Sequence, residues 1–155
     1  MKKIMLVFVG ILILCLSGCG GGSSANAPDV ISLDGKSISY YDSSTKIPDE
    51  FWDEDVDFRV NSDNEIRLIT IKSSDVETYN GISVGDSISK VESKYKYESK
   101  FDYIVNVAFK GNKEIKVGTQ EATSEYICVS YVFDKSTKKI TTIMISDGLY
   151  AKMAK

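Results

Sequence analysis

The chain has 155 residues, a net charge of −3 and no histidine. An acidic surface argues against binding to nucleic acid, whose phosphates attract basic patches. The chain has no histidine, so a serine or cysteine nucleophile would have no histidine base, and a histidine–cysteine metal site cannot form. We therefore expect no catalytic residue, no metal and no cofactor.

The N-terminal segment has the pattern of an export signal. Two lysines precede an apolar run over residues 4–16, which is shorter than the roughly 20 residues that cross a bilayer. The sequence Leu16-Ser17-Gly18-Cys19 resembles the lipobox of bacterial lipoproteins processed by the type II signal peptidase. The resemblance implies that residues 1–18 are a signal peptide and that Cys19 is lipidated, with acyl chains such as palmitate. The mature protein would then be extracytoplasmic and anchored to the membrane.

Residues 19–27 predict a flexible tether after the lipidated cysteine, because glycine, serine and alanine dominate it. We expect a single domain over residues 28–155. Once Cys15 leaves with the signal peptide and Cys19 is lipidated, Cys128 is the remaining thiol, so no intramolecular disulfide is expected. Its apolar neighbours indicate a small buried residue in a strand.

The first half of the domain predicts short strands and one short helix. Apolar residues on both sides of Asp34-Gly35 indicate two strands joined by a turn. Pro48, followed by acidic residues, predicts a helix near 48–54. Alternating apolar residues around the turn at 62–64 predict a hairpin, with Ile69 and Ile71 on its inner face.

An acidic run within and after this short helix resembles part of a calcium loop. Asp53, Asp55 and Asp57 have the spacing of its first ligands, but Phe58 stands where glycine is required and Asn64 where glutamate is required. We therefore expect a solvated acidic turn and no metal site.

The aromatic residues are the weak candidates for a ligand-binding site. Nine tyrosines are present, and Tyr40, Tyr41 and Trp52 could stack on a sugar or on a protein partner. Tyrosine is also common in strands, so a purely structural role remains the alternative.

The clearest helix is predicted at about 87–95. Asp86 is a suitable N-cap, and Ile88, Val91 and Tyr95 form one apolar stripe. The preceding Gly81-Ile82-Ser83-Val84-Gly85-Asp86 resembles a turn found in small extracytoplasmic lipoproteins of the beta-lactamase-inhibitor-protein and outer-membrane-assembly-lipoprotein type. The resemblance implies a helix followed by antiparallel strands and a role in protein binding. It assigns no partner-binding residue.

The second half predicts strands by alternation. We expect strands over 101–109 and 127–133, a short edge strand near 115–117, and a final strand that ends a second hairpin. The residues expected to face one core, together with the helix, are Phe101, Tyr103, Val105, Val107, Phe109, Ile127, Val129, Tyr131, Phe133, Ile69, Ile71, Ile143 and Ile145.

The two predicted hairpins are similar in sequence. Ile66, Ile69 and Ile71 have the same spacing as the second isoleucine triplet, Ile140-x-x-Ile143-x-Ile145. Either any two amphipathic hairpins share such a pattern, or the chain is a degenerate duplication. In both cases the fold class is α+β, an antiparallel sheet with one main helix.

The sequence favours a lipid-anchored protein of the cell envelope that binds a protein or ligand without catalysis. Its partners would be the membrane, through the anchor, and an envelope protein. The alternatives are a cell-wall hydrolase that uses carboxylates and a purely structural envelope component. Two carboxylates about 5–9 Å apart in a pocket would favour the hydrolase, whereas a flat or concave aromatic sheet face would favour binding.

Overall fold

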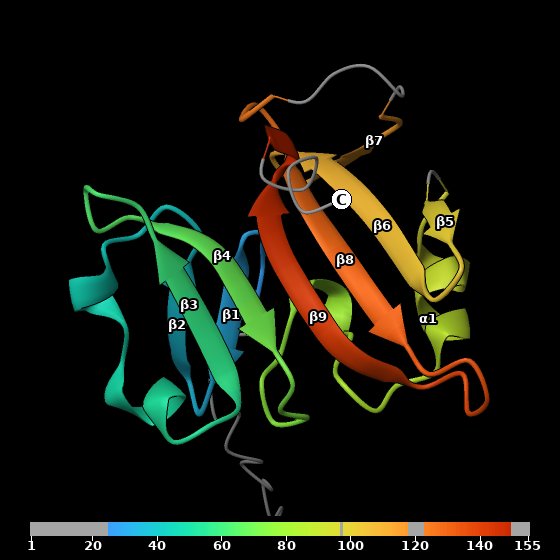
Figure 1. The fold of residues 1–155 in the computed structure, drawn as a ribbon, viewed down its shortest axis with the longest axis horizontal. Coiled ribbons are helices and arrows are strands. Elements are labelled where there is room, and N and C mark those ends of the chain that lie inside the picture. The colour runs from blue at the N-terminus through green and yellow to red at the C-terminus, as the bar shows by residue number, and fades with distance from the viewer. Residues whose placement is uncertain (1–24, 97, 118–122, 150–155) are drawn as a thin grey trace, which may run out of the picture.

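A computed structural model of the chain describes residues 25–96, 98–117 and 123–149. Its main element is an antiparallel sheet with the strand order β3-β4-β9-β8-β6-β5, in which β7 also pairs with β6 (Figure 1). The strands of this sheet are β3 (Val56–Val60), β4 (Ile66–Ile71), β5 (Ser99–Phe101), β6 (Ile104–Lys110), β7 (Lys113–Ile115), β8 (Ile127–Phe133) and β9 (Ile140–Asp147). The predicted signal peptide over 1–18 and the predicted lipidation site Cys19 lie outside the described residues, as does most of the predicted tether.

A second layer covers one face of the sheet. It consists of the hairpin β1 (Val30–Leu33) and β2 (Lys36–Ser39), the helix α1 (Ile88–Lys94), and the short 3-10 helices η1 (Ser44–Lys46), η2 (Asp49–Trp52) and η3 (Tyr79–Gly81). In Figure 1 the sheet lies in front, with α1 and the β1–β2 hairpin behind it. The predicted α+β class with one main helix is confirmed. Among the described residues, no helix has the length and apolar character needed to span a membrane.

The core lies between these two layers. Val107, Ile69, Ile71, Ile143 and Ile145 are all fully buried, as the predicted strand register requires. The helix covers the same core through its predicted stripe, since Ile88, Val91 and Tyr95 are also buried. Ile127 is half-buried and packs against this core.

The predicted continuous strand over 101–109 is wrong at its start. The chain reverses at Asp102, whose φ is 44°, so that β5 and β6 form a tight hairpin in which Phe101 pairs with Ile104. Phe101 and Tyr103 are therefore outside the core, with 50% and 45% of their surface exposed. The sequence did not reveal this turn for two reasons. Aromatic or apolar residues alternate with the others across it, and aspartate can adopt the left-handed conformation, so no glycine marks the reversal.

The helix also begins one residue later than predicted. Ser87 is the N-cap, and its side chain accepts a hydrogen bond from the amide of Ser89. Asp86 instead accepts from the Ser83 amide at 2.9 Å and pairs with Lys90 at 2.6 Å. Partial burial alone would raise the pKa of Asp86, but these contacts lower it below its ordinary value. The helix predicted near 48–54 is the shorter 3-10 helix η2, with Phe51 in the core.

A local structure occurs twice along the chain. Asp42 and Asp86 each accept a hydrogen bond from the amide of a serine three residues earlier. Each pairs with the lysine four residues later. Each also precedes a serine, Ser43 or Ser87, that caps the following helix. Isolated bridges then join Ser43 to the β3–β4 turn and Ser87 to the β8–β9 turn.

The two hairpins that follow are also equivalent. Both contain a bulge, in which the extra residue is Arg67 of β4, opposite Arg59 and Val60, and Thr141 of β9, opposite Val132 and Phe133. Where the hairpins meet, Thr70 of β4 pairs with Met144 of β9, and the flanking pairs are Ile69 with Ile145 and Ile71 with Ile143. This arrangement defines a local two-fold axis between β4 and β9. As a result, β3 and β8 occupy equivalent places in the two halves of the sheet.

Asp134 in the β8–β9 turn accepts several hydrogen bonds that favour its charged form. Its carboxylate accepts from the Ser136 and Thr137 amides, at 2.9 and 2.7 Å, and from both of their hydroxyls. These hydrogen bonds lower its pKa from 3.8 to about 2. A lowered folded-state pKa gives stability that is present above about pH 4 and is lost as the pH falls through about 2.

We therefore expect the substitution Asp134→Asn to reduce the loss of thermal stability between about pH 5 and pH 2. The turn itself should remain intact, because an asparagine, Asn61, accepts two amide hydrogen bonds in the β3–β4 turn, from Asp63 and Glu65. The measurement is the unfolding midpoint of the full chain across this pH range, with Asp63→Asn as the control. Equal acid sensitivity of Asp134→Asn and the parent would contradict the expectation.

Candidate functional site

The aromatic residues proposed from the sequence do not form one exposed platform. Tyr40 is buried, with 2% of its surface exposed, so it cannot act as the exposed aromatic contact that the sequence suggested. Tyr41 and Trp52 are exposed to 38% and 60%. They belong to different ring contacts, since Tyr41 packs on Tyr40 at 4.3 Å and Trp52 packs on Phe58 at 5.8 Å between ring centres.

Tyr40 and Tyr41 are instead part of a cluster around Arg67, which we call the Arg67 cluster: Tyr40, Tyr41, Arg67 and Asp147. The Arg67 Nη2 donates to Asp147 Oδ2 at 2.7 Å. The Tyr41 hydroxyl donates to the same oxygen at 3.2 Å. The guanidinium carbon lies 4.7 Å from the centre of the Tyr41 ring and 5.8 Å from that of Tyr40. The cluster thereby ties together the segment after β2, the bulge of β4 and the end of β9.

Tyr41 is held in a backbone conformation that a tyrosine seldom adopts. Its φ is 74°, and Gly85, with a φ of 90°, stands at the equivalent place before the second Asp-Ser pair. Left-handed backbone disfavours side chains with a Cβ. The ring contact with Arg67 and the hydrogen bond to Asp147 therefore offset the strain at Tyr41.

The charges of the Arg67 cluster make it a stable ion pair and not an acid–base pair. Burial raises the pKa of Tyr40 to about 12. Burial and the nearby Asp147 carboxylate also raise the pKa of Tyr41. Burial of Arg67 acts against its charge, but the adjacent tyrosines and Asp147 outweigh it and raise its pKa. Both phenols therefore stay protonated near neutral pH, and neither can serve as a base there.

The sequence contained a signal for Asp147 that the prediction did not use. Ile143, Ile145 and Asp147 share one face of β9, so a carboxylate continues the row of core residues. Asp147 is fully buried, and a buried carboxylate requires a cation or hydrogen-bond donors. Arg67 had no comparable signal, because its position depends on the bulge of β4.

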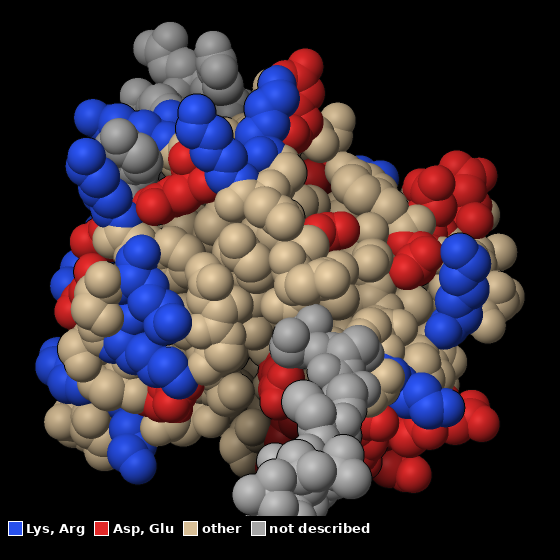
Figure 2. Space-filling model, turned by 180° about the vertical axis from the view of Figure 1, so that it is seen from behind, with Lys and Arg blue, Asp and Glu red and all other residues tan. Residues whose placement is uncertain are grey.

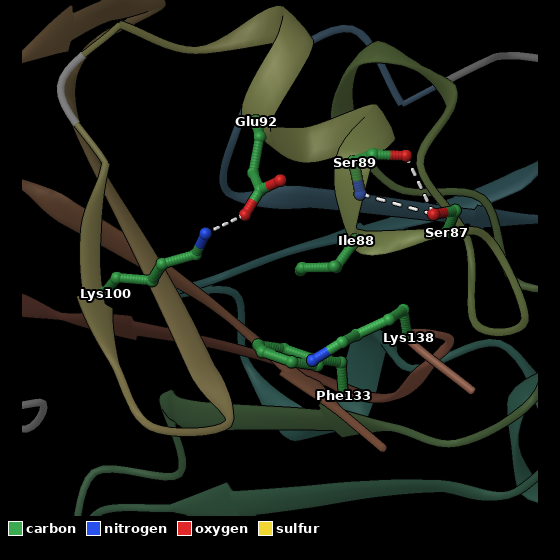
Figure 3. Close-up of a pocket in the computed structure, with 7 residues that line it drawn as sticks. All are labelled: Ser87, Ile88, Ser89, Glu92, Lys100, Phe133 and Lys138. Atoms are coloured by element: carbon green, nitrogen blue, oxygen red, sulfur yellow. Dashed lines mark hydrogen bonds and ion pairs between the residues drawn. The ribbon is translucent and has the colours of Figure 1, made fainter. Parts of the chain in front are cut away.

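A hollow of about 330 Å³ lies beside α1 (Figure 3). It is lined by Ser87, Ile88, Ser89, Glu92, Lys100, Phe133 and Lys138. Its single carboxylate, Glu92, forms an ion pair with Lys100, and the Lys138 ammonium lies 5.6 Å from the centre of the Phe133 ring. A second carboxylate at the spacing of a glycoside hydrolase is absent from this lining.

The face of the sheet that points away from α1 and the β1–β2 hairpin, here called the open face, has uncharged side chains in the middle of its four central strands, β4, β9, β8 and β6. Cross-strand pairing arranges its side chains in rows. The rows are Asn106, Ser130, Met144 and Thr70; Ile104, Val132 and Thr142; and Ala108, Cys128 and Ser146. Ser130 and the third of these rows are buried, whereas the other members are half-buried. Charged residues of β3 and β6, such as Asp57, Arg59 and Lys110, stand only at its margins.

Small polar groups on the open face are hydrogen-bonded to one another. The Ser130 hydroxyl donates to Asn106 Oδ1 at 2.6 Å, and the Cys128 sulfur lies 3.8 Å from the same hydroxyl.

Figure 2 views the opposite side of the molecule, where the surface is uncharged in the middle, with acidic residues on the side of η2 and lysines on the side of α1. Among the described residues, no three Asp, Glu or Cys side chains lie close enough together to hold a metal ion.

No protein-family model matches this chain, and no curated protein or solved structure matches it.

Proposed function

We propose that the chain is a lipid-anchored envelope protein whose domain binds a protein partner through the open face of its sheet, without catalysis. The observation on which this rests is the uncharged surface that extends across β6, β8, β9 and β4. The centres of protein interfaces are depleted of charge and combine apolar contacts with paired polar groups. A quarter of all residues in the chain are charged, whereas the half-buried side chains in the middle of this face, such as Thr70, Thr142 and Met144, are uncharged.

The arrangement of the carboxylates supports binding over hydrolysis. Asp147, the buried carboxylate, is neutralised by Arg67, and Glu92 in the hollow beside α1 is paired with Lys100. A carboxylate-based hydrolase needs one carboxyl group that keeps its proton and a second one nearby. The lipobox resemblance and the glycine-rich tether support a place at the membrane surface, from which the domain could reach a partner in any orientation.

The proposal is tested by placing a charge on the open face. We expect Thr70→Lys and Met144→Lys each to reduce recovery of the crosslinked partner from the native envelope at least tenfold, because a lysine in an interface centre must lose its hydration. Thermal unfolding midpoints should change little, since both side chains are only half-buried. The matched control is Ser93→Lys, which adds the same charge on α1 behind the sheet.

Two results would count against this function. One is equal recovery of the same partner by both open-face variants and the parent. The other is hydrolysis of peptidoglycan by the purified full chain, with loss of the activity when a single carboxylate such as Glu92 is changed to glutamine.

A further inference from the structure

β3 is the outermost strand at one end of the sheet, and within the described residues it pairs only with β4, so that no strand pairs with its outer edge (Figure 1). The equivalent edge in the other half of the internal repeat is paired. There β8, the equivalent of β3, uses this edge to pair with β6 over six residue pairs, from Ile104–Val132 to Phe109–Ile127. The same position in the second half of the sheet is thus built to accept an antiparallel strand.

The phase of the hydrogen bonds shows which backbone groups of β3 point outward. The amide of Lys72 donates to the carbonyl of Asp55 at 2.8 Å, so Asp55 and Lys72 form a hydrogen-bonded pair. Alternation along the strand then directs the backbone groups of Asp57 and Arg59 toward β4. The amides and carbonyls of Phe58 and Val60 consequently point away from the sheet, toward any strand added at this edge.

We propose that this edge joins two copies of the chain, with β3 of each copy paired antiparallel across a two-fold axis at Phe58. In this register the outward groups of Phe58 bond to those of Phe58 in the second copy. The amide of Val60 likewise faces the carbonyl of Val56 of the second copy. The two sheets then become one continuous sheet.

The charges of β3 select this register. Asp57 lies opposite Arg59 of the second copy, and Arg59 lies opposite Asp57 of the second copy, so both cross-strand pairs attract. Sliding one strand by two residues brings Asp57 against Asp57 or Arg59 against Arg59. A parallel, in-register arrangement also places like charges side by side. Charged edge strands commonly block association, but this pattern is self-complementary in one register only.

Apolar groups beside the edge supply the remaining contact area. Trp52 and Val60 are exposed to 60% and 45% in the single chain. Phe58 is half-buried and packs edge-to-face on Trp52. In the paired arrangement Val60 lies opposite Val56 of the second copy, and the two Phe58 side chains meet. The Asp57 and Arg59 side chains are only loosely joined within one chain, at 3.9 Å, and both are mostly exposed, so they are available for the second copy.

Register-specific crosslinking tests the arrangement directly. Two differently tagged full-length chains, one with Asp57→Cys and one with Arg59→Cys, are produced together and oxidised with diamide. Opposed residues of a non-hydrogen-bonded pair have Cα atoms about 4.5 Å apart, which suits a disulfide, whereas two copies of Asp57→Cys would be about 7–8 Å apart. We expect roughly tenfold more dimer from the mixed pair than from either variant alone. The parent chain measures any background from its own cysteines.

Charge exchange provides the second arm. Asp57→Arg and Arg59→Asp should each lose association with themselves, because like charges then face each other. The two variants should associate when mixed, because every cross-strand pair becomes complementary again. Binding is followed between the tagged full-length chains, with protease resistance as the check that each variant is folded.

The outcomes are decisive in both directions. Crosslinking in the mixed pair together with rescue by charge exchange supports the pairing of two copies. Folded variants that give no register-specific crosslink overturn it. Equal crosslinking in all combinations, association unaffected by the charge changes, or pairing of β3 with the β5 edge of a second copy would also overturn it.

Discussion

Replacing Arg67 by methionine should lower the free energy of unfolding by about 3 kcal/mol. The substitution keeps an unbranched side chain of similar length but leaves the Asp147 carboxylate without its cation. The Asp147 side chain is 1% exposed, so water cannot replace the guanidinium. Removing one partner of a buried ion pair costs about 3–5 kcal/mol, and the lower end applies here because Arg67 itself is 27% exposed.

Denaturant unfolding of the full chain measures the effect, and two comparisons isolate its cause. Lys72→Met removes an exposed ion pair with Asp55 and should change stability by about 0.5 kcal/mol or less. Adding Asp147→Asn to Arg67→Met should restore part of the loss, because the buried negative charge is removed. If the double variant is less stable than Arg67→Met by the full cost of Asp147→Asn alone, the two residues act independently and this account of the cluster is wrong.

The change Cys19→Ala should abolish lipid attachment and, with it, retention of the protein in the membrane fraction. Alanine lacks the thiol that the lipobox resemblance assigns as the acceptor of the diacylglyceryl group. Two acyl chains provide stable anchoring, since each buried methylene contributes about 0.8 kcal/mol. An acidic chain has no compensating attraction to anionic lipid.

Incorporation of a labelled fatty acid, followed by fractionation, measures this result. Cys15→Ala is the matched control, because it removes a thiol four positions earlier in the apolar run and should leave labelling intact. Normal labelling and membrane retention of Cys19→Ala would show that the cysteine is not the anchor.

The strands and their inner faces could be predicted from the sequence because alternation is a local property. Val105, Val107 and Phe109 face the core as expected, and so do Val129 and Tyr131. Errors arose where one turn could be built in two ways. A two-residue reversal at Asp102 leaves the alternation unchanged, and Ser87 was as good a cap as Asp86 by residue type alone.

The Arg67 cluster could not be predicted in the same way. Arg67 and Asp147 are 80 residues apart in sequence, and they meet only because β4 pairs with β9. Periodicity identifies each strand but not its neighbour in the sheet. For the same reason the aromatic pair Tyr40-Tyr41 gave no indication that Tyr40 would be buried under the sheet while Tyr41 stayed at the surface. Of the three aromatic residues suggested from the sequence, Tyr41 and Trp52 are therefore exposed and Tyr40 is buried.

The junction between β4 and β9 also has a consequence for the order of folding. Each hairpin, β3–β4 and β8–β9, closes a short loop and can form early, because little chain entropy is lost. Their union across the local two-fold axis brings together regions far apart in sequence and completes the Arg67–Asp147 ion pair only at that stage. We therefore infer that this junction forms late. Until then, two amphipathic hairpins with open edges are present in the same chain, and their edges can pair with those of other chains that are still folding.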